Sequence, residues 1–288
     1  MDVSIIIVTY NTRVLTSNCI DSIIQNTTGV SYEIILVDNA SVDGSKQLFE
    51  KDNRITYIYN TVNVGFGRAN NIGYKVAKGK YIFLLNSDTI LQNNSVKIFR
   101  DAMDHMPSNV ACIGSQLLNG DGLPTKSFGP FFSFNVIIPK HVNQIIDYKI
   151  PDDGVPVDVI IGADMFIKKE VADIYGLFDP VFFMYQEEND MQRRYAAHGY
   201  ISKIIEGPKI VHLEGKSNKH TINVRMIGGA YTYMKKWYPL WKYYLFRLLY
   251  SITRTPKIFM NECDFNEKIR FLKVLYFYKA DRSKMKMN

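Results

Sequence analysis

The tripeptide Asn86-Ser87-Asp88 follows the apolar run 80–85 and carries a carboxylate that could hold a metal ion. One carboxylate at a strand end is enough for a hard divalent cation when a bound diphosphate and water supply the other oxygens. His212 is a candidate second ligand, and its softer imidazole nitrogen favours Mn²⁺ over Mg²⁺. The alternatives are an aspartate that caps the next turn and a structural histidine.

Glu187, Glu188 and Asp190 form an acidic cluster at the start of a predicted helix over 187–198. On a helix, Glu187, Asp190 and Arg194 lie on one face, whereas Glu188 points about 100° away. One of these carboxylates could act as the general base for an incoming hydroxyl group. Alternatively, the acids only complement the helix dipole, with Arg194 as a partner.

The segment 63–71, NVGFGRANN, opens another predicted helix. Its glycines would let backbone amides approach a phosphate at the helix N-terminus, and Arg68 could contact the phosphate or remain solvated. The segment does not match the G-x-G-x-x-G fingerprint of dinucleotide-binding proteins. The sequence also lacks the G-x-x-x-x-G-K-[ST] motif, which excludes a P-loop NTPase.

Strands and helices that alternate along the first half of the chain would position these residues. Apolar, β-branched runs predict buried strands at 3–9, 33–37, 55–59 and 80–85, with helices over about 13–25 and 67–77, the latter closed by Gly79. This spacing predicts an α/β fold with a mostly parallel, doubly wound sheet. Residues 119–156 look irregular, and further strands are expected at 157–161 and 201–205.

Polar residues follow each of the first four predicted strands. In parallel sheets, ligands bind beyond the carboxyl ends of the strands, so these residues should meet in one crevice. The ordinary alternative is turn formation, which asparagine and aspartate favour. The four groups are Thr9-Tyr10-Asn11, Asp38-Asn39, Asn60 to Asn63, and Asn86-Ser87-Asp88.

The net charge of +7 is concentrated in a C-terminal tail. Residues 221–288 hold 14 Lys and Arg but 4 Asp and Glu, whereas the rest of the 288 residues is slightly acidic. The three cysteines are far apart, which favours a reducing compartment. The first residues have no basic segment typical of a signal peptide.

The tail is also rich in aromatic residues, and Pro239 is expected to start a helix in it. Aromatic residues flanked by cations suit the headgroup region of a membrane, while the alternative is a helix packed on the body with an aromatic core. No recognition motif for nucleic acid accompanies the charge. The predicted apolar stripe of this helix is Leu240, Trp241, Tyr244, Leu245, Leu248, Leu249 and Ile252.

Taken together, the motifs resemble those of the family 2 glycosyltransferases of GT-A fold, particularly rhamnosyltransferase-like members that build bacterial surface polysaccharides. The resemblance covers about residues 3–240. Each motif is weak alone, but seven in order at compatible spacing are specific. They are VSIIIVTYN (3–11), ILVDNASVDGS (35–45), NVGFGRANNIG (63–73), FLLNSDT (83–89), GADMFIKKE (162–170), GLFDPVFFMYQEENDMQRR (176–194) and VHLEGKS (211–217).

The resemblance implies a nucleotide-sugar donor, with Asp38 on its base. Asp88 matches the second aspartate of the family's metal-binding D-x-D motif, Asn86 stands at the first, and His212 matches a distal metal ligand. The donor would bind along Thr9, Tyr10, Asn11, Asp38, Asn39, Asn63, Gly65, Phe66, Arg68, Asn71, Asn86, Ser87, Asp88, Gly162 and Ala163.

Two positions depart from the family pattern. The usual aspartate base is Glu188 here, beside Glu187, and Asp164 stands where many relatives carry an apolar residue. Since a displacement of about 1 Å can cost roughly a hundredfold in rate, Asp190 is an alternative base.

The resemblance implies an inverting, metal-dependent hexosyl- or deoxyhexosyl-transferase that uses Mn²⁺ or Mg²⁺ and a UDP- or dTDP-sugar. The acceptor would be a hydroxyl of a glycan or lipid-linked saccharide. Residues 1–220 would form the catalytic domain, and the tail 221–288 would hold it peripherally on the inner, cytoplasmic face of the cell membrane.

Two other functions compete with this hypothesis. A non-catalytic protein that binds the donor or a glycan would be consistent with the replaced base. A sugar nucleotidyltransferase should carry glycines just after its first strand, where this chain reads Tyr10-Asn11-Thr12-Arg13.

Overall fold

The most continuous apolar runs form the centre of an eight-stranded sheet. β1 (Val3–Thr9) pairs in parallel with β2 (Tyr32–Asp38) on one side and with β4 (Tyr81–Asn86) on the other. The strand order is β3-β2-β1-β4-β10-β6-β11-β8. The remaining strands are β3 (Thr56–Tyr59), β10 (Asp164–Lys168), β6 (Val110–Ser115), β11 (Ile201–Ile205) and β8 (Val155–Val157).

The sheet is mostly parallel, which confirms the expected α/β fold. β10 runs antiparallel to β4 and β6, and β8 runs antiparallel to β11. The computed structural model describes residues 1–137, 144–213, 224–260 and 265–279. The end of the motif 211–217 and the expected domain boundary after residue 220 lie outside these ranges.

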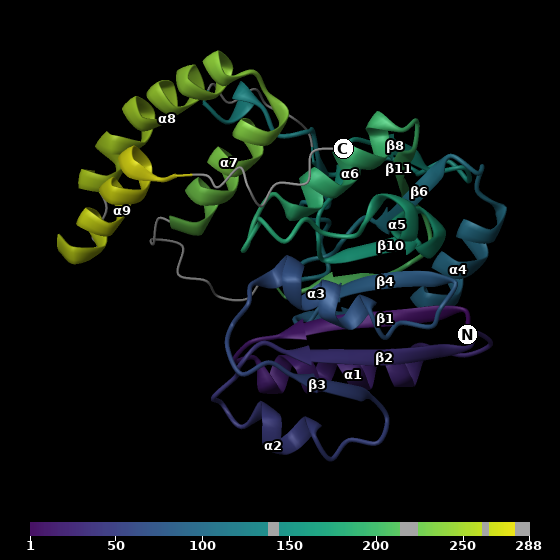
Figure 1. The fold of residues 1–288 in the computed structure, drawn as a ribbon. Coiled ribbons are helices and arrows are strands. Elements are labelled where there is room, and N and C mark those ends of the chain that lie inside the picture. The colour runs from purple at the N-terminus through teal and green to yellow at the C-terminus, as the bar shows by residue number, and fades with distance from the viewer. Residues whose placement is uncertain (138–143, 214–223, 261–264, 280–288) are drawn as a thin grey trace.

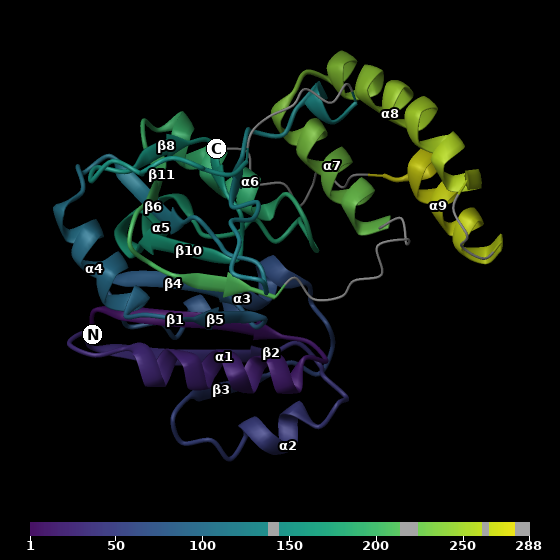
Figure 2. The same ribbon diagram turned by 180° about the vertical axis from the view of Figure 1, so that it is seen from behind.

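Helices cover both faces of the sheet, as Figures 1 and 2 show. Ile5 and Ile7 of β1 pack in one apolar layer with α1 (Arg13–Asn26), α2 (Ser45–Phe49) and α4 (Ser95–His105). Ile6 points to the opposite layer, formed with α3 (Phe66–Tyr74), α5 (Lys169–Tyr175) and α6 (Glu187–Ala197). The alternation of side chains along β1 therefore builds two cores.

Two details of the expected elements are wrong. The strand expected at 157–161 is split, because the chain bends at Asp158. The carboxylate of Asp158 accepts a hydrogen bond from the amide of Phe131. β8 ends before this bend, and β9 (Val159–Ile160) follows it and pairs with β7 (Phe128–Gly129). Gly79 does not close α3, which ends at Tyr74. A Cβ at Gly79 would lie 2.4 Å from the backbone nitrogen of Ser4, so this glycine permits close approach to β1.

A two-stranded sheet outside the main one positions the predicted metal ligands. β5 (Thr89–Leu91) pairs antiparallel with β12 (Ile210–His212), and His212 lies opposite Thr89. A short 3-10 helix, η1, covers Phe134–Val136.

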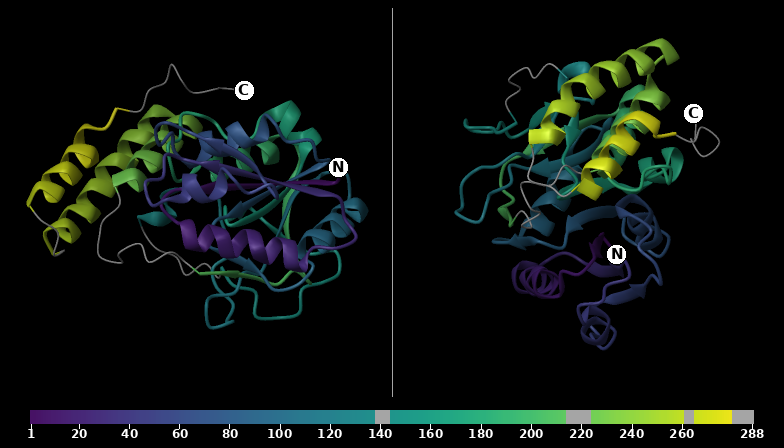
Figure 3. Two further views of the ribbon diagram at one scale, coloured as in Figure 1. Left: turned by 90° about the horizontal axis from the view of Figure 1, so that it is seen from below. Right: turned by 90° about the vertical axis from the view of Figure 1, so that its left-hand side faces the viewer.

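Three helices at one side of the sheet form the described part of the tail (Figures 1 and 3). They are α7 (Val224–Trp237), α8 (Leu240–Met260), which follows Pro239 as expected, and α9 (Phe265–Phe277). Tyr231, Tyr243, Phe246, Phe271 and Leu275 are buried between them. Within the described ranges, no helix combines the length and apolar character needed to cross a membrane.

The tail therefore has an aromatic core and also an exposed apolar face. Six of the seven residues of the predicted stripe on α8 are exposed, and Leu249 is half-buried. The six are Leu240, Trp241, Tyr244, Leu245, Leu248 and Ile252.

Candidate active site

The carboxyl ends of the central strands meet at one edge of the sheet. Thr9 is in register with Asp38, and Val8 with Asn86. Beyond this edge lies a cavity of about 370 Å³, closed on the other side by the start of α6. The predicted site residues that line it are Tyr10, Asn39, Asn63, Gly65, Phe66, Asn86, Ser87, Asp88, Gly162, Glu187 and Glu188.

Asp88 and the acids of α6 therefore share one cavity, although about a hundred residues separate them in the chain. This juxtaposition is the central requirement of the sequence-based hypothesis, because a donor phosphate and an acceptor hydroxyl must meet in the same space.

Asp88 lies directly against His212. Its Oδ1 atom is 3.2 Å from Nε2 of His212, and Nδ2 of Asn86 is 3.5 Å from the same nitrogen. The amide of Leu213 donates to the backbone oxygen of Asp88, which fixes the two segments together. A carboxylate and an imidazole placed side by side are a pair of ligands that fits a divalent cation. Among the described residues, no group of three or more potential metal ligands occurs, so bound phosphate and water would complete the coordination.

Glu187 and Glu188 begin α6 and line the same cavity as Asp88. Glu187 is 3% exposed, and its Oε2 atom has no hydrogen-bond partner within the described part of the chain. Burial raises the pKa of both carboxyls, and the charge of Glu188 raises the pKa of Glu187 further. A carboxylate with a raised pKa is a better proton acceptor near neutral pH than an exposed one.

The backbone just before these acids is strained. Tyr185 and Gln186 have φ angles of 68° and 73°, in the left-handed region that residues with a Cβ rarely adopt. The carbonyl oxygen of Phe183 accepts the amide of Phe66, so this segment is also fastened to α3. A Cβ at Gly65 would lie 2.1 Å from the same oxygen, which requires glycine there.

The loop 63–66 is a wall of the cavity and offers few free amides. The amide of Val64 donates to Oδ1 of Asn39, and the amide of Gly65 donates to Oδ1 of Asn63. The amide of Phe66 donates to the carbonyl oxygen of Phe183. The expected phosphate cradle of backbone amides is therefore not present at residues 64–66.

Three residues at the strand ends that were predicted to contact the nucleotide-sugar donor instead form hydrogen bonds within the protein. Thr9 bonds to Thr16, Asp38 accepts from the backbone of Ser41 and the hydroxyl of Tyr57, and Asn11 accepts the amide of Val42. The side chains of Thr9 and Asp38 are fully buried, and neither residue nor Asn11 lines the cavity. The geometry gives all three a role in shaping the turns and does not support direct contact with the nucleoside.

Arg68, Asn71 and Ala163 also lie outside the cavity. Nε of Arg68 donates to the carbonyl of Pro180, and the amide side chain of Asn71 bonds to both backbone groups of Phe178. Ala163 is buried, and its carbonyl accepts the amide of Asn86. Arg68 and Asn71 therefore hold the segment 176–186 against α3.

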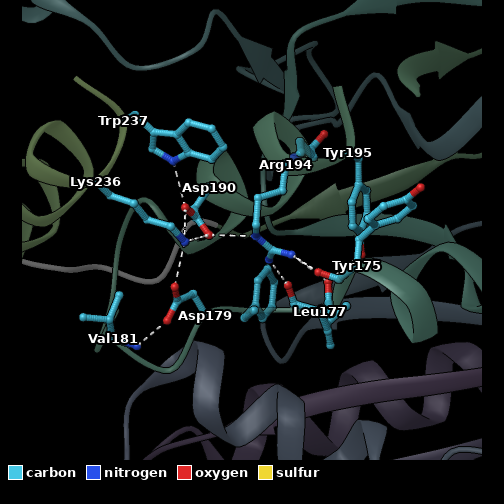
Figure 4. Close-up of polar contacts among 12 residues, drawn as sticks. Tyr175, Leu177, Asp179, Val181, Asp190, Arg194, Tyr195, Lys236 and Trp237 are labelled. Carbon is cyan, nitrogen blue, oxygen red and sulfur yellow. Dashed lines mark hydrogen bonds and ion pairs between the residues drawn. The ribbon is translucent and has the colours of Figure 1, made fainter. Parts of the chain in front are cut away.

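Asp190 is not a candidate for the base. It is fully buried, and three side chains donate to its carboxylate, two of them cations and one an indole N–H (Figure 4). Nζ of Lys236 lies 2.8 Å from Oδ1, Nε1 of Trp237 donates to Oδ1 at 2.8 Å, and Nε of Arg194 donates to Oδ2 at 3.1 Å. Lys236 also pairs with Asp179 at 2.6 Å, so the cluster joins α6 to α7 and to the segment before α6.

Eight cavity residues were not predicted: Phe183, Met184, Tyr185, Arg225, Val8, Thr12, Leu15 and Ile161. The aromatic run that immediately precedes the acidic cluster is a signal that could have identified the first three. Arg225 stands at the start of α7, and no local pattern connects it with the cavity.

Comparison with known proteins identifies the family. The family model described as Glycosyl transferase family 2 matches residues 4–153, more than half of the chain. The poly(ribitol-phosphate) beta-glucosyltransferase of Bacillus spizizenii is 33% identical over 134 residues, 44% of this chain and 21% of that protein. The low-salt glycan biosynthesis hexosyltransferase Agl10 of Haloferax volcanii is 29% identical over 195 residues, 65% of this chain and 59% of that protein.

The chain thus spans less than two thirds of the length of these curated relatives. A crystal structure of GalNAc-T7 with UDP, GalNAc and Mn²⁺ superposes with a TM-score of 0.64 at 15% identity, over 96% of this chain and 54% of that one. This likeness concerns the fold, which is the GT-A fold expected from the sequence. Because the family model matches more than half of the chain, including β1, β2 and β4 whose carboxyl ends border the cavity, the chain belongs to glycosyl transferase family 2.

Proposed function

We propose that the protein is an inverting glycosyltransferase, moving a sugar from a nucleoside diphosphate to a hydroxyl of a glycan or lipid-linked saccharide in cell-surface polysaccharide synthesis. The observation that carries the proposal is the single cavity lined by Asp88, Glu187 and Glu188, with His212 lying 3.2 Å behind the Asp88 carboxylate. Of the relatives named above, one is a poly(ribitol-phosphate) beta-glucosyltransferase and another a hexosyltransferase of glycan biosynthesis, which supports this class of acceptor. UDP- and dTDP-sugars, including deoxyhexoses such as rhamnose, are the donors to test first.

In the reaction, the acceptor oxygen bonds to the anomeric carbon while the bond from that carbon to the diphosphate breaks. The acceptor proton passes to a carboxylate of α6, for which we assign Glu188 with Glu187 as the alternative. Glu187, which is 3% exposed, would line the most buried part of the cavity. Inversion follows because attack and departure occur on opposite faces of the sugar.

Asp88 and His212 would hold Mn²⁺ or Mg²⁺ at the diphosphate end of the cavity. A cation bound there would neutralise the charge that develops on the departing diphosphate. The proposal is tested by assaying transfer from a panel of nucleotide sugars with Mn²⁺, with Mg²⁺ and with EDTA. Asp88→Ala should abolish the metal-dependent rate, whereas the matched control Asp121→Ala, on an exposed loop, should keep it.

Undiminished transfer by Asp88→Ala and in EDTA would show that the reaction does not depend on this pair. Donor binding in a thermal-shift screen without transfer to any acceptor would instead favour the non-catalytic alternative.

We propose in addition that the exposed face of α8 binds the cytoplasmic surface of the cell membrane. Trp241, Tyr244 and Leu248 lie on this face, and Lys242 and Arg247 flank it. Cations beside anionic lipid contribute about 1 kcal/mol each. Leu248→Ser should reduce flotation with phosphatidylglycerol vesicles, while Leu48→Ser, an equally simple change on α2, should not. Equal flotation of both variants would exclude this face.

A further inference from the structure

A second cavity, of about 240 Å³, lies beside the candidate active site between the segment before α6 and helices α7 and α9. The two cavities share Phe183, Met184 and Arg225 as lining residues. The wall between them is therefore formed by a few side chains, and a molecule that occupies both could pass over it.

The charged side chains among the described residues of this lining are both arginines, Arg225 and Arg270. Both are exposed, and the guanidinium carbon of Arg225 lies 5.0 Å from the centre of the Phe183 ring. The hydroxyls of Thr232 and Tyr278 bond to each other at 3.0 Å and also line the cavity. Guanidinium groups bind phosphate oxygens in pairs of hydrogen bonds, and hydroxyls can add further donors.

Two consecutive glycines in the middle of α7 make this arrangement possible. Each glycine in a helix interior costs about 1 kcal/mol relative to alanine, so an adjacent pair indicates a steric requirement. A Cβ at Gly229 would lie 2.5 Å from the carbonyl oxygen of Tyr185, and one at Gly228 would press on the Tyr278 ring at 3.3 Å. The glycines bring α7 close to the segment before α6 and keep the cavity beside it open.

We propose that this second cavity binds the phosphate or diphosphate that joins an acceptor saccharide to a lipid. The anion lies between Arg225 and Arg270, and the attached saccharide extends across Phe183 and Met184 toward Glu188. The lipid extends along α9, where Phe277, one to two turns beyond Arg270, is 77% exposed. This inference rests on the proposed glycosyl transfer and specifies the acceptor of that same site.

Arg270 separates this inference from donor binding, because it lines the second cavity and not the first. The probe is farnesyl diphosphate, titrated by calorimetry in EDTA into the wild-type chain, Arg270→Gln and the control Lys273→Gln. Lys273 is exposed on the same helix and does not line the cavity. Loss of a charge-assisted bond predicts about tenfold weaker binding to Arg270→Gln and no change for Lys273→Gln.

Wild-type affinity of Arg270→Gln for farnesyl diphosphate would overturn the proposal, as would absence of binding to the wild-type chain. Inorganic pyrophosphate is the second probe: binding as tight as that of farnesyl diphosphate, with the same dependence on Arg270, would overturn the assignment to a lipid-linked group. Circular dichroism melting of each variant establishes that it is folded.

The failure of this inference and of the proposed function are distinguishable. Nucleotide-sugar binding in the presence of Mn²⁺ reports on the first cavity alone, and Arg270→Gln should bind the donor like the wild type. If the donor binds and Arg270→Gln leaves farnesyl diphosphate affinity unchanged, only the acceptor assignment fails. If no nucleotide sugar binds the wild-type chain, the glycosyl transfer proposal fails irrespective of the second cavity.

Discussion

Neighbouring acids in the first turn of α6 have opposite surroundings. Glu187 and Glu188 face a cavity, and one oxygen of Glu187 has no hydrogen-bond partner in the described part of the chain. Three residues after Glu187, Asp190 is surrounded by Lys236, Arg194 and Trp237 (Figure 4). Compensated carboxylates stabilise a fold, whereas uncompensated ones in a cavity are available for chemistry.

The largest expected effect concerns the first turn. Glu188→Gln removes the proposed proton acceptor with little change in shape, so the transfer rate should fall about a thousandfold. The measurement is kcat with the identified donor and acceptor, and Glu50→Gln, at an exposed position, is the matched control. If Glu188→Gln retained full activity while Glu187→Gln lost it, the base would be Glu187.

The next largest effect concerns the ion-pair cluster around Asp190. Lys236→Met leaves Asp179 and Asp190 without their shared cation, and removing one partner of a buried pair costs about 3 kcal/mol of unfolding free energy. Urea denaturation measures this loss, and Lys75→Met, at the exposed position directly after α3, should be nearly neutral. A neutral Lys236→Met would mean that this cluster does not stabilise the contact between α6 and α7.

The pH dependence of transfer should reflect the ionisation of Glu188. Burial raises the pKa of Glu188 above its ordinary value of 4.5, and the base must be deprotonated to accept a proton. Activity should therefore fall as the pH drops through this raised value, at a higher pH than an exposed glutamate would give. A pH profile of kcat/KM with an acid limb at or below 4.5 would contradict this environment.

The smallest expected effect is a gain in stability at the expense of function. Burial raises the pKa of Glu187, so its carboxyl ionises less readily in the folded state than in the unfolded chain. Its ionisation has no effect on stability below the pKa of the unfolded chain, destabilises the folded state as the pH rises above that value, and has its full effect above the raised pKa. Glu187→Gln should therefore raise the unfolding free energy by about 1 kcal/mol at pH 8 and by nothing at pH 4. Thermal melts at the two pH values measure the difference, and an equal gain at both would indicate a cause other than charge.

The sequence predicts the sheet and the position of the site well, because both depend on local patterns. The β-branched runs of β1, β2 and β4 and the polar residues behind them are contiguous in the chain. Two strands of the main sheet, β6 and β10, were not predicted. β10 is short and begins with the buried Asp164, which accepts hydrogen bonds from both the amide and the hydroxyl of Ser115.

The partners of the acids were harder to predict, because they are distant in the chain. Asp190 has the same sequence context as Glu187, yet its cation, Lys236, comes from α7. Arg225 also comes from α7 and lines the cavity, although it is distant in the chain from the other lining residues. Thr9 and Asp38 were correctly placed at strand ends, but burial of their side chains depends on the packing of the following turns.

Gly229 has a consequence for attempts to exchange modules between related enzymes. A Cβ at this position would lie 2.5 Å from the carbonyl oxygen of Tyr185, which belongs to the strained turn just before Glu187 and Glu188. A chimera that joins this sheet to a foreign C-terminal segment would press any larger residue at this position against that turn. Such hybrids should retain their donor specificity but misalign the proton acceptor, unless the transplanted helix also brings a glycine to this contact.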